Sequence, residues 1–357
     1  MKHLAKLAAS VALALLASGA ASARQSALEI SLAPSSEKAD AGSGKLRYTI
    51  SNFGTTDLLV LAWETPLRGI DADLFDVRKD GKPVQYTGRE FKRGLPQPED
   101  YIEIKAGQSL GVDIDLSAHY EMQVKGNYAA QAVAHFHDGF AVHASNGDEK
   151  LAPISDRDLR SETVHLWVDG ANVPYAREPY GVFNFAKAGS VGFVGCNNSQ
   201  ITSINSGVSA ARTMSTSANS YLGANQSGAR YTTWFGAYSS TRYATVKSNF
   251  TAINDALNNQ PLVFDCSTCT QSAYAYVYPT QHYKVYLCGA YWNAPTSGTD
   301  SKGGTTIHEV SHFNVVAATD DLAYGQTACK RLTKKPNSAI RNADSHEYFA
   351  ENTPALN

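Results

Sequence analysis

The sequence feature that most constrains this chain is the pattern His308-Glu309-Val310-Ser311-His312. In an α-helix, residues i and i+4 lie one above the other, so the pattern predicts a helix over 304–316 with both imidazoles on one face. Neutral imidazole is a good zinc ligand, and the glutamate beside the first histidine can accept the proton of an activated water. We therefore predict a catalytic zinc site with His308 and His312 as ligands and Glu309 as general base.

A catalytic zinc site takes three protein ligands and leaves one position for water. The stretch 316–325 that follows the predicted helix contains no histidine, so the third ligand is expected to be a carboxylate. Two neighbouring residues, Asp320 and Asp321, compete for this role, because a slip of one residue in the turn would exchange them.

The stretch Ala318-Thr319-Asp320-Asp321-Leu322-Ala323-Tyr324-Gly325 resembles the pattern Gly-Thr-x-Asp-x-x-Tyr-Gly of the aspzincin metallopeptidases, and most closely of the peptidyl-Lys metalloendopeptidases. The resemblance implies one zinc ion with Asp321 as its third ligand, and Tyr324 as the donor to the transition state. Ala318 stands where the family has glycine, and alanine would strain the turn modestly if its φ is positive.

The same resemblance extends through 231–236, 273–279, 285–290 and 342–352. It implies that Asp344 and Glu347 form an acidic pocket for a lysine side chain, so that cleavage occurs on the amino side of Lys. Residues three apart share a helix face, but without the family context these two acids would be an ordinary solvated pair. Their charge alone does not reject arginine.

Five cysteines, none of them before residue 196, indicate an oxidising destination. The resemblance implies disulfides from Cys196 to Cys266 and from Cys269 to Cys288. Cys329 is then left over and is expected to be a small buried side chain.

The first 23 residues have the basic start, the apolar run and the small-residue end of a secretory signal peptide. The apolar run is shorter than the roughly 20 residues that a spanning helix needs. With 31 basic and 33 acidic residues the net charge is −2, which predicts neither a nucleic-acid partner nor a polybasic membrane anchor. We expect a secreted, extracellular protein.

At 357 residues the chain is predicted to form two domains. An all-β, sandwich-like unit is expected over 24–172, a linker and processing region over 173–190, and an α+β, zincin-like catalytic domain over 191–357. The strands predicted in the first unit are 46–51, 58–63, 75–78, 84–87, 102–104, 111–116 and 128–135, with an Asp-Gly hairpin turn at 79–82. The helices predicted in the second are 201–222, 242–257 and 339–351, and its strands are 263–264, 273–278 and 285–287.

The first unit has no catalytic residues and is predicted to be a propeptide that acts as an intramolecular inhibitor. If the enzyme cuts before lysine, the bond between Ala186 and Lys187 is a site for self-cleavage. The alternative is cleavage after Arg177 by a trypsin-like enzyme.

These features predict a secreted zinc endopeptidase, made as a zymogen, whose substrates are proteins or peptides that contain lysine. One alternative is a deuterolysin-like endopeptidase with a broader or generally basic specificity. The other is a secreted binding protein stabilised by zinc, which is disfavoured because structural zinc sites usually have four protein ligands.

Overall fold

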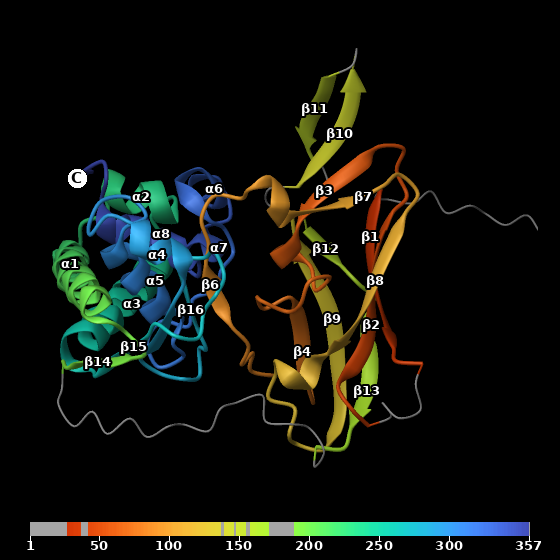
Figure 1. Ribbon diagram of the computed structural model, residues 1–357, viewed down its shortest axis with the longest axis horizontal. Helices are drawn as coiled ribbons and strands as arrows, with labels where there is room; N and C mark the ends of the chain where they lie inside the picture. Colours follow the sequence, from red (N-terminus) through yellow and green to blue (C-terminus); the bar gives the residue numbers. More distant parts are fainter. Residues whose placement is uncertain are drawn as a thin grey trace, which may run out of the picture.

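The computed structural model describes residues 27–36, 42–136, 139–145, 148–154, 158–170 and 189–356. The predicted signal peptide, Arg177 and the Ala186–Lys187 bond lie outside these ranges. In Figure 1 the described residues form a β-rich N-terminal part and a C-terminal part of helices around a sheet. None of the helices within the described ranges has the length and apolar character needed to cross a bilayer.

The N-terminal part contains short strands, all but one of which lie in three sheets. Their bounds are β1 (Leu28–Pro34), β2 (Lys45–Asn52), β3 (Asp57–Leu61), β4 (Phe75–Lys79), β5 (Lys82–Pro83), β6 (Glu90–Lys92), β7 (Tyr101–Ile104), β8 (Ser109–Asp115), β9 (Gly126–His135), β10 (Phe140–Ser145), β11 (Asp148–Pro153), β12 (Asp158–Arg160) and β13 (Val164–Val168). The sheet orders are β1-β2-β8, β11-β10-β3-β7 and β12-β9-β4-β5, and β13 also pairs with β9. All three sheets contribute to one hydrophobic core.

Alternation of apolar residues produces these strands. In β2, Leu46, Tyr48 and Ile50 are buried while their neighbours are more exposed, as expected for a strand with one face on a core. Asp80 and Gly81, with φ of 51° and 76°, form the predicted tight turn between β4 and β5.

The strand predicted over 84–87 is wrong. β5 ends at Pro83. The Val84 N–H still donates to the Val77 carbonyl at 2.8 Å, but the chain then leaves β4, and Tyr86 forms an isolated bridge to Tyr120 instead.

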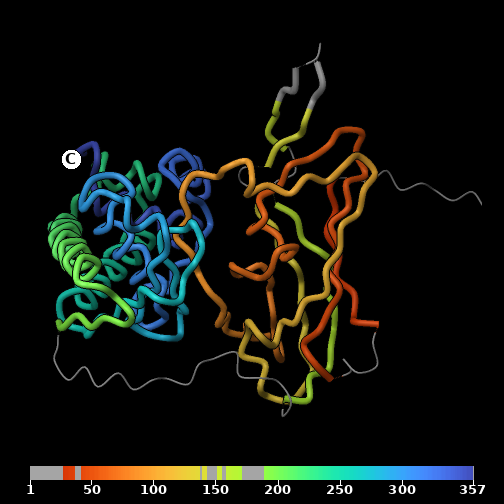
Figure 2. The backbone as a smooth tube through the Cα atoms, viewed as in Figure 1, coloured from red at the N-terminus to blue at the C-terminus, as the bar shows by residue number. Residues whose placement is uncertain are grey.

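The C-terminal part alternates helices with short strands. Their bounds are β14 (Val191–Val194), α1 (Asn198–Gly223), α2 (Ala229–Phe235), α3 (Ser240–Asn259), β15 (Leu262–Asp265), β16 (Ala275–Val277), β17 (Lys284–Leu287), α4 (Gly289–Asn293), α5 (Lys302–His312), α6 (Gly325–Leu332), α7 (Pro336–Ala339) and α8 (Ala343–Glu351). The sheet order is β14-β15-β17-β16-β6. Its last strand, β6, therefore comes from the N-terminal part, and Figure 2 shows this segment running alongside the C-terminal part.

Two predicted helices differ from the observed ones. The helix predicted over 304–316 ends at His312, because the carbonyl of Ser311 accepts its hydrogen bond from the N–H of Thr319 after the chain has turned back. The helix predicted over 339–351 is two helices, α7 and α8, separated where the Asn342 side chain accepts hydrogen bonds from Leu322 and Ala323.

Helix α5 is the centre of the C-terminal part, and every one of its residues is buried. It contacts α1, α3 and α8. Its two glycines permit this close packing, because a Cβ on Gly303 would lie 2.9 Å from Ala210 of α1, and a Cβ on Gly304 would collide with Glu351 of α8.

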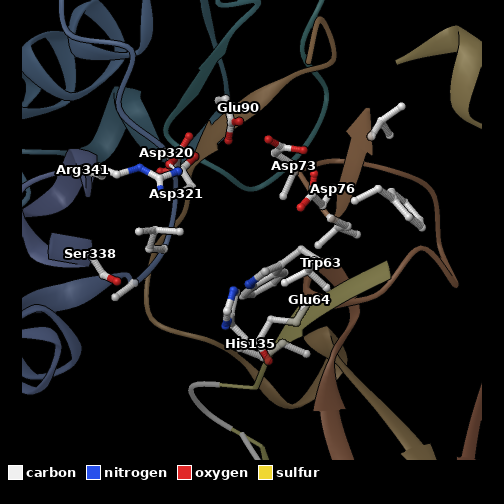
Figure 3. A pocket seen from close by; sticks show the side chains of 18 of the residues that line it. Trp63, Glu64, Asp73, Asp76, Glu90, His135, Asp320, Asp321, Ser338 and Arg341 are labelled. Carbon is white, nitrogen blue, oxygen red and sulfur yellow. Dashed lines mark hydrogen bonds and ion pairs between the residues drawn. The ribbon is translucent and has the colours of Figure 1, made fainter. Parts of the chain in front are cut away.

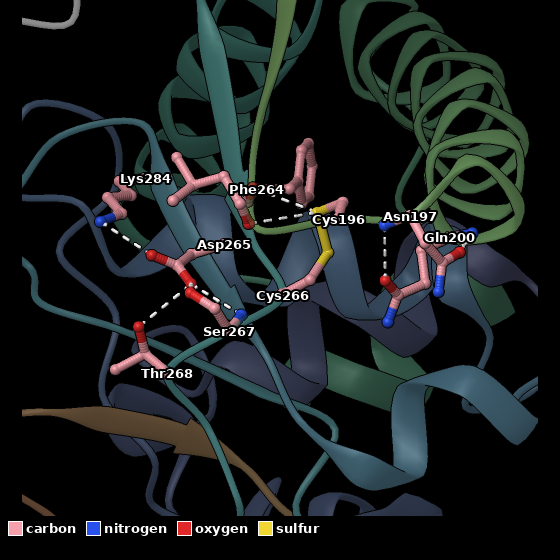
Figure 4. Close-up of a disulfide and its surroundings, with 10 residues drawn as sticks. Cys196, Asn197, Gln200, Phe264, Asp265, Cys266, Ser267, Thr268 and Lys284 are labelled. Atoms are coloured by element: carbon pink, nitrogen blue, oxygen red, sulfur yellow. Dashed lines mark hydrogen bonds and ion pairs between the residues drawn. A yellow bond between two sulfur atoms is a disulfide. The ribbon is translucent and has the colours of Figure 1, made fainter.

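Both disulfides implied by the resemblance are present. Cys196 is joined to Cys266 and Cys269 to Cys288, and Cys329 is a buried free cysteine. The first bridge connects the ends of β14 and β15 beside the start of α1 (Figure 4).

Candidate metal centre and substrate cleft

Helix α5 presents the two histidines on one face. The helix begins after Ser301, whose Oγ accepts a hydrogen bond from the Gly304 N–H at 2.9 Å. The imidazole rings of His308 and His312 lie one turn apart, with centroids separated by 4.8 Å, and both are fully buried.

The turn after α5 brings Asp321 against this face. Its Oδ1 lies 3.1 Å from Nε2 of His308 and its Oδ2 lies 3.5 Å from Nε2 of His312. Asp320 instead points to Arg341, with which it forms an ion pair, and Figure 3 shows these two side chains together. The turn that makes this choice contains Ala318 at φ 46°, the left-handed conformation for which glycine is better suited.

Both histidines are oriented through their other ring nitrogen. Nδ1 of His308 lies 2.8 Å from Oδ1 of Asp344, and Nδ1 of His312 lies 2.8 Å from the carbonyl oxygen of Thr319. Such partners fix the ring and leave Nε2 free for a metal. Burial lowers the pKa of His312 to about 4, so this ring is neutral near pH 7, as a ligand must be.

The donor atoms at this place fit a zinc ion. Nε2 of His312 and both carboxylate oxygens of Asp321 are buried without a hydrogen-bond partner, and the ligand atoms of His308, His312 and Asp321 lie within 4.8 Å of one another. Two imidazoles and one carboxylate are a typical set for catalytic zinc, which leaves a position open.

The ligand atoms of His308, Asp344 and Glu347 also lie within 4.8 Å of one another, but the ammonium group of Lys92 already contacts both of those carboxylates. They are better explained as a cation pocket beside the metal centre.

Glu309 is fully buried beside the three candidate ligands. Burial raises the pKa of its carboxyl to about 8, and a bound dication would lower that pKa again. Its Oε1 accepts a hydrogen bond from the Lys92 N–H at 3.2 Å, whereas its Oε2 has no hydrogen-bond partner.

Tyr324 precedes α6, and its ring meets Trp63 of the N-terminal part edge to face, with centroids 6.3 Å apart. Burial raises its pKa well above the usual value, so the hydroxyl stays protonated and can donate a hydrogen bond.

The two predicted pocket acids are both buried on α8, and between them lies Lys92 from the N-terminal part. Its Nζ is 2.8 Å from Oε2 of Glu347, 3.5 Å from Oδ1 of Asp344 and 3.2 Å from Oδ1 of Asp300. Burial would raise the pKa of Asp344, but Lys92 and His308 outweigh it and lower that pKa to about 2. This carboxylate is therefore charged at neutral pH.

Sequence reasoning missed Lys92 and Asp300. The stretch 24–168 contains eight lysines, and nothing in the local sequence distinguishes Lys92 from the others. Only the expected preference for lysine would have justified examining each one as an occupant of the site.

A cavity of about 620 Å³ lies between the two parts and reaches the metal centre. Asp321 and Tyr324 line it from the C-terminal part, and Trp63, Asp73 and Glu90 from the N-terminal part. In Figure 3 the carboxylates of Glu90 and Asp73 point into this space opposite Asp320 and Asp321.

Residues 220–351 match the aspzincin M35 family, described as lysine-specific metallo-endopeptidase. The chain is 43% identical over 317 residues to a protein named extracellular protease from Aeromonas hydrophila, covering 88% of this chain and 89% of that protein. It is 34% identical over 341 residues to a peptidyl-Lys metalloendopeptidase from Armillaria mellea, with 92% of each chain covered. A solved structure described as a zinc peptidase from Grifola frondosa is 47% identical and covers 45% of this chain and 100% of that one, with a TM-score of 0.43. Similarity to the first two proteins extends beyond 220–351 into the N-terminal part.

Proposed function

The chain belongs to the aspzincin family of zinc metalloendopeptidases, and from that premise we propose that it hydrolyses peptide bonds on the amino side of lysine. The observation that carries the proposal is the position of Lys92. A buried lysine ammonium rests against Asp344 and Glu347, directly beside the candidate metal ligand His308. A substrate lysine held there would have its peptide nitrogen beside Glu309.

We assign the zinc ion to His308, His312 and Asp321. Zinc, when bound there, supplies the Lewis acidity that activates water and polarises the substrate carbonyl. Glu309 accepts the proton of the attacking water and then gives it to the leaving amine nitrogen. Tyr324 donates a hydrogen bond to the oxyanion that develops on the carbonyl.

Asp344 has two roles in this proposal. Its Oδ1 holds Nδ1 of His308, and its Oδ2 accepts the Gly325 N–H at 2.7 Å, next to Tyr324. It therefore joins the metal ligand, the turn that carries the oxyanion donor and the lysine pocket. Glu347 supplies the second charge of the pocket.

We further propose that the protein is secreted as a zymogen. The N-terminal part, 24–172, is assigned as the propeptide, 191–357 as the catalytic domain, and Ala186–Lys187 as a processing bond in the linker. The relative named extracellular protease and the signal-like first 23 residues support secretion. The pairing of β6 with the edge of the C-terminal sheet supports inhibition by the N-terminal part.

Glu309→Gln tests the assigned chemistry, because the amide keeps the shape of the side chain but cannot accept the proton. Because the variant is not expected to process itself, it is processed with added wild-type enzyme, which is then removed. We expect the processed variant to bind zinc as the wild type does and to lose at least about 100-fold in kcat. Bound zinc is measured by atomic emission, and turnover is measured with a lysyl peptide as substrate. Wild-type turnover with normal zinc content would refute the role of Glu309.

A further inference from the structure

Strand β6 occupies the edge of the catalytic sheet in the way an extended peptide would. It pairs antiparallel with β16, with Phe91 opposite Tyr276 and Lys92 opposite Ala275, and the Lys92 carbonyl accepts the Tyr274 N–H at 2.9 Å. Addition of a strand to an exposed edge is a general mode of peptide recognition, in which backbone bonds give affinity and side-chain pockets give specificity.

The Lys92 side chain is completely buried in the acidic pocket. Its exposed fraction is 0%, and its ammonium also lies 5.1 Å from the Tyr274 ring centroid and 5.7 Å from that of Tyr348. A charge so far from water is tolerated only where carboxylates compensate it, and here Asp344 and Glu347 do so. While Lys92 is there, a substrate lysine cannot enter.

The register places one peptide bond at the catalytic glutamate. The Lys92 N–H donates to Oε1 of Glu309 at 3.2 Å, which is where this carboxyl would deliver a proton to a leaving amine. The side chains on either side of Lys92 make their contacts outside the pocket. Phe91 packs on Tyr276 with 4.9 Å between ring centroids, and the Arg93 guanidinium lies 4.7 Å from the Trp63 ring centroid.

We propose that β6 is a tethered substrate: Lys92 blocks the lysine pocket of the unprocessed chain, and Phe91–Lys92 is the first bond cut when zinc is bound. Water adds its oxygen to the carbonyl carbon of Phe91, the bond to the Lys92 nitrogen breaks, and a proton passes to that nitrogen. The products are a carboxylate at Phe91 and an amine at Lys92. A bond already seated at Glu309 is hydrolysed before Ala186–Lys187, which must first replace β6 in the cleft. This inference rests on the proposed lysine specificity.

The first test follows self-cleavage of the full chain. Protein prepared with a chelator is given zinc, and samples taken over time are analysed by mass spectrometry for new amino termini. We expect Lys92 to be the first new terminus in the wild type and to be absent from Glu309→Gln. A first cut elsewhere, with Phe91–Lys92 intact, would overturn the order of cleavage.

The second test measures latency before any processing. We expect full-length Lys92→Ala to hydrolyse an external lysyl peptide at least ~10-fold faster than the full-length wild type, because the tethered competitor for the pocket is gone. Lys105→Ala is the matched control, since Lys105 also contacts two carboxylates, Asp57 and Glu103, but is exposed. Equal initial rates in Lys92→Ala and the wild type would overturn the proposal.

A third test measures how accessible the Lys92 amine is, and it requires neither catalytic activity nor a substitution of Lys92. In the full-length Glu309→Gln chain, amine acetylation should modify Lys105 at least ~10-fold faster than Lys92, and equal rates would overturn occupation of the pocket. If the processed wild type cuts unfolded proteins with no preference for lysine, the proposed specificity fails instead. The acetylation result then still decides whether β6 sits in the cleft.

Discussion

Asp344 and Glu347 occupy one pocket but differ in their relation to the metal centre, so their amide variants should separate two functions. Oδ1 of Asp344 lies 2.8 Å from Nδ1 of the proposed ligand His308, whereas the nearest oxygen of Glu347 is 3.4 Å from that nitrogen. Glu347 is the nearer partner of the bound ammonium, at 2.8 Å against 3.5 Å for Asp344. Both substitutions, Asp344→Asn and Glu347→Gln, preserve side-chain shape.

The expected magnitudes follow from these contacts. Removing one charged partner from a buried ammonium costs about 2–3 kcal/mol, so kcat/KM for lysyl peptides should fall roughly 30- to 150-fold in Glu347→Gln. Loss of the carboxylate behind a metal-bound histidine typically weakens metal affinity by about 10- to 100-fold. Asp344→Asn should therefore lose both zinc affinity and activity, while Glu347→Gln keeps its zinc affinity within about 3-fold of the wild type.

The assay uses processed enzyme, a zinc titration against a competing chelator, and a pair of peptides that differ only in lysine or norleucine after the cut bond. Activity is measured at saturating zinc, so that the two effects are read separately. The reasoning would be refuted if Glu347→Gln lost as much zinc affinity as Asp344→Asn, or if it kept the wild-type preference for lysine over norleucine.

Three further substitutions test other parts of the account. Burial alone would raise the pKa of Asp265, but hydrogen bonds from Ser267 and Lys284 outweigh it and lower that pKa. The charged carboxylate therefore stabilises the folded protein above the unfolded pKa of about 3.9, and this contribution is lost as pH falls through the folded pKa. Asp265→Asn, at the site shown in Figure 4, should lower the free energy of unfolding at pH 7 by about 1–3 kcal/mol, and thermal melts should converge with the wild type in acid; a constant difference down to pH 3 would contradict this. Ala318→Gly removes a Cβ from a residue at φ 46° and should raise stability by about 1 kcal/mol in denaturant unfolding, and a loss of stability would show that the turn is unstrained. Tyr324→Phe should lower kcat by about 100-fold or more with little change in KM, and a selective rise in KM would assign Tyr324 to substrate binding instead.

The parts of the site that depend on local sequence were predictable. The spacing of His308 and His312 requires only one helical turn, and helix α5 supplies it. The choice between Asp320 and Asp321 could not be made from local sequence, because it depends on the direction of a turn. That direction is fixed by the contact of the Thr319 carbonyl with His312 and by the ion pair of Asp320 with Arg341. From the residues alone both carboxylates remained open, and only the family register favoured Asp321.

The contacts that cross between the two parts could not be read from sequence. Lys92 reaches Glu347 through the pairing of a three-residue strand, β6, with the edge of a distant sheet. A segment that short has too few residues to reveal alternation, so no strand was predicted there. In the same way, the end of α5 at His312 depends on the hydrogen bond from the Thr319 N–H to the Ser311 carbonyl. This is a tertiary contact, which the periodicity of apolar residues in a helix does not predict.

The central claim is that a zinc centre with Glu309 as base cuts before lysines held by Asp344 and Glu347. The most direct test is mass spectrometry of the peptides released from an unrelated unfolded protein by processed wild type and Glu309→Gln, each with and without a chelator. We predict fragments that begin overwhelmingly with lysine, formed only by the wild type and abolished by chelation. Fragments with no preference for an amino-terminal lysine would contradict the pocket assignment, and undiminished cleavage by Glu309→Gln or in the chelator would contradict the catalytic centre itself.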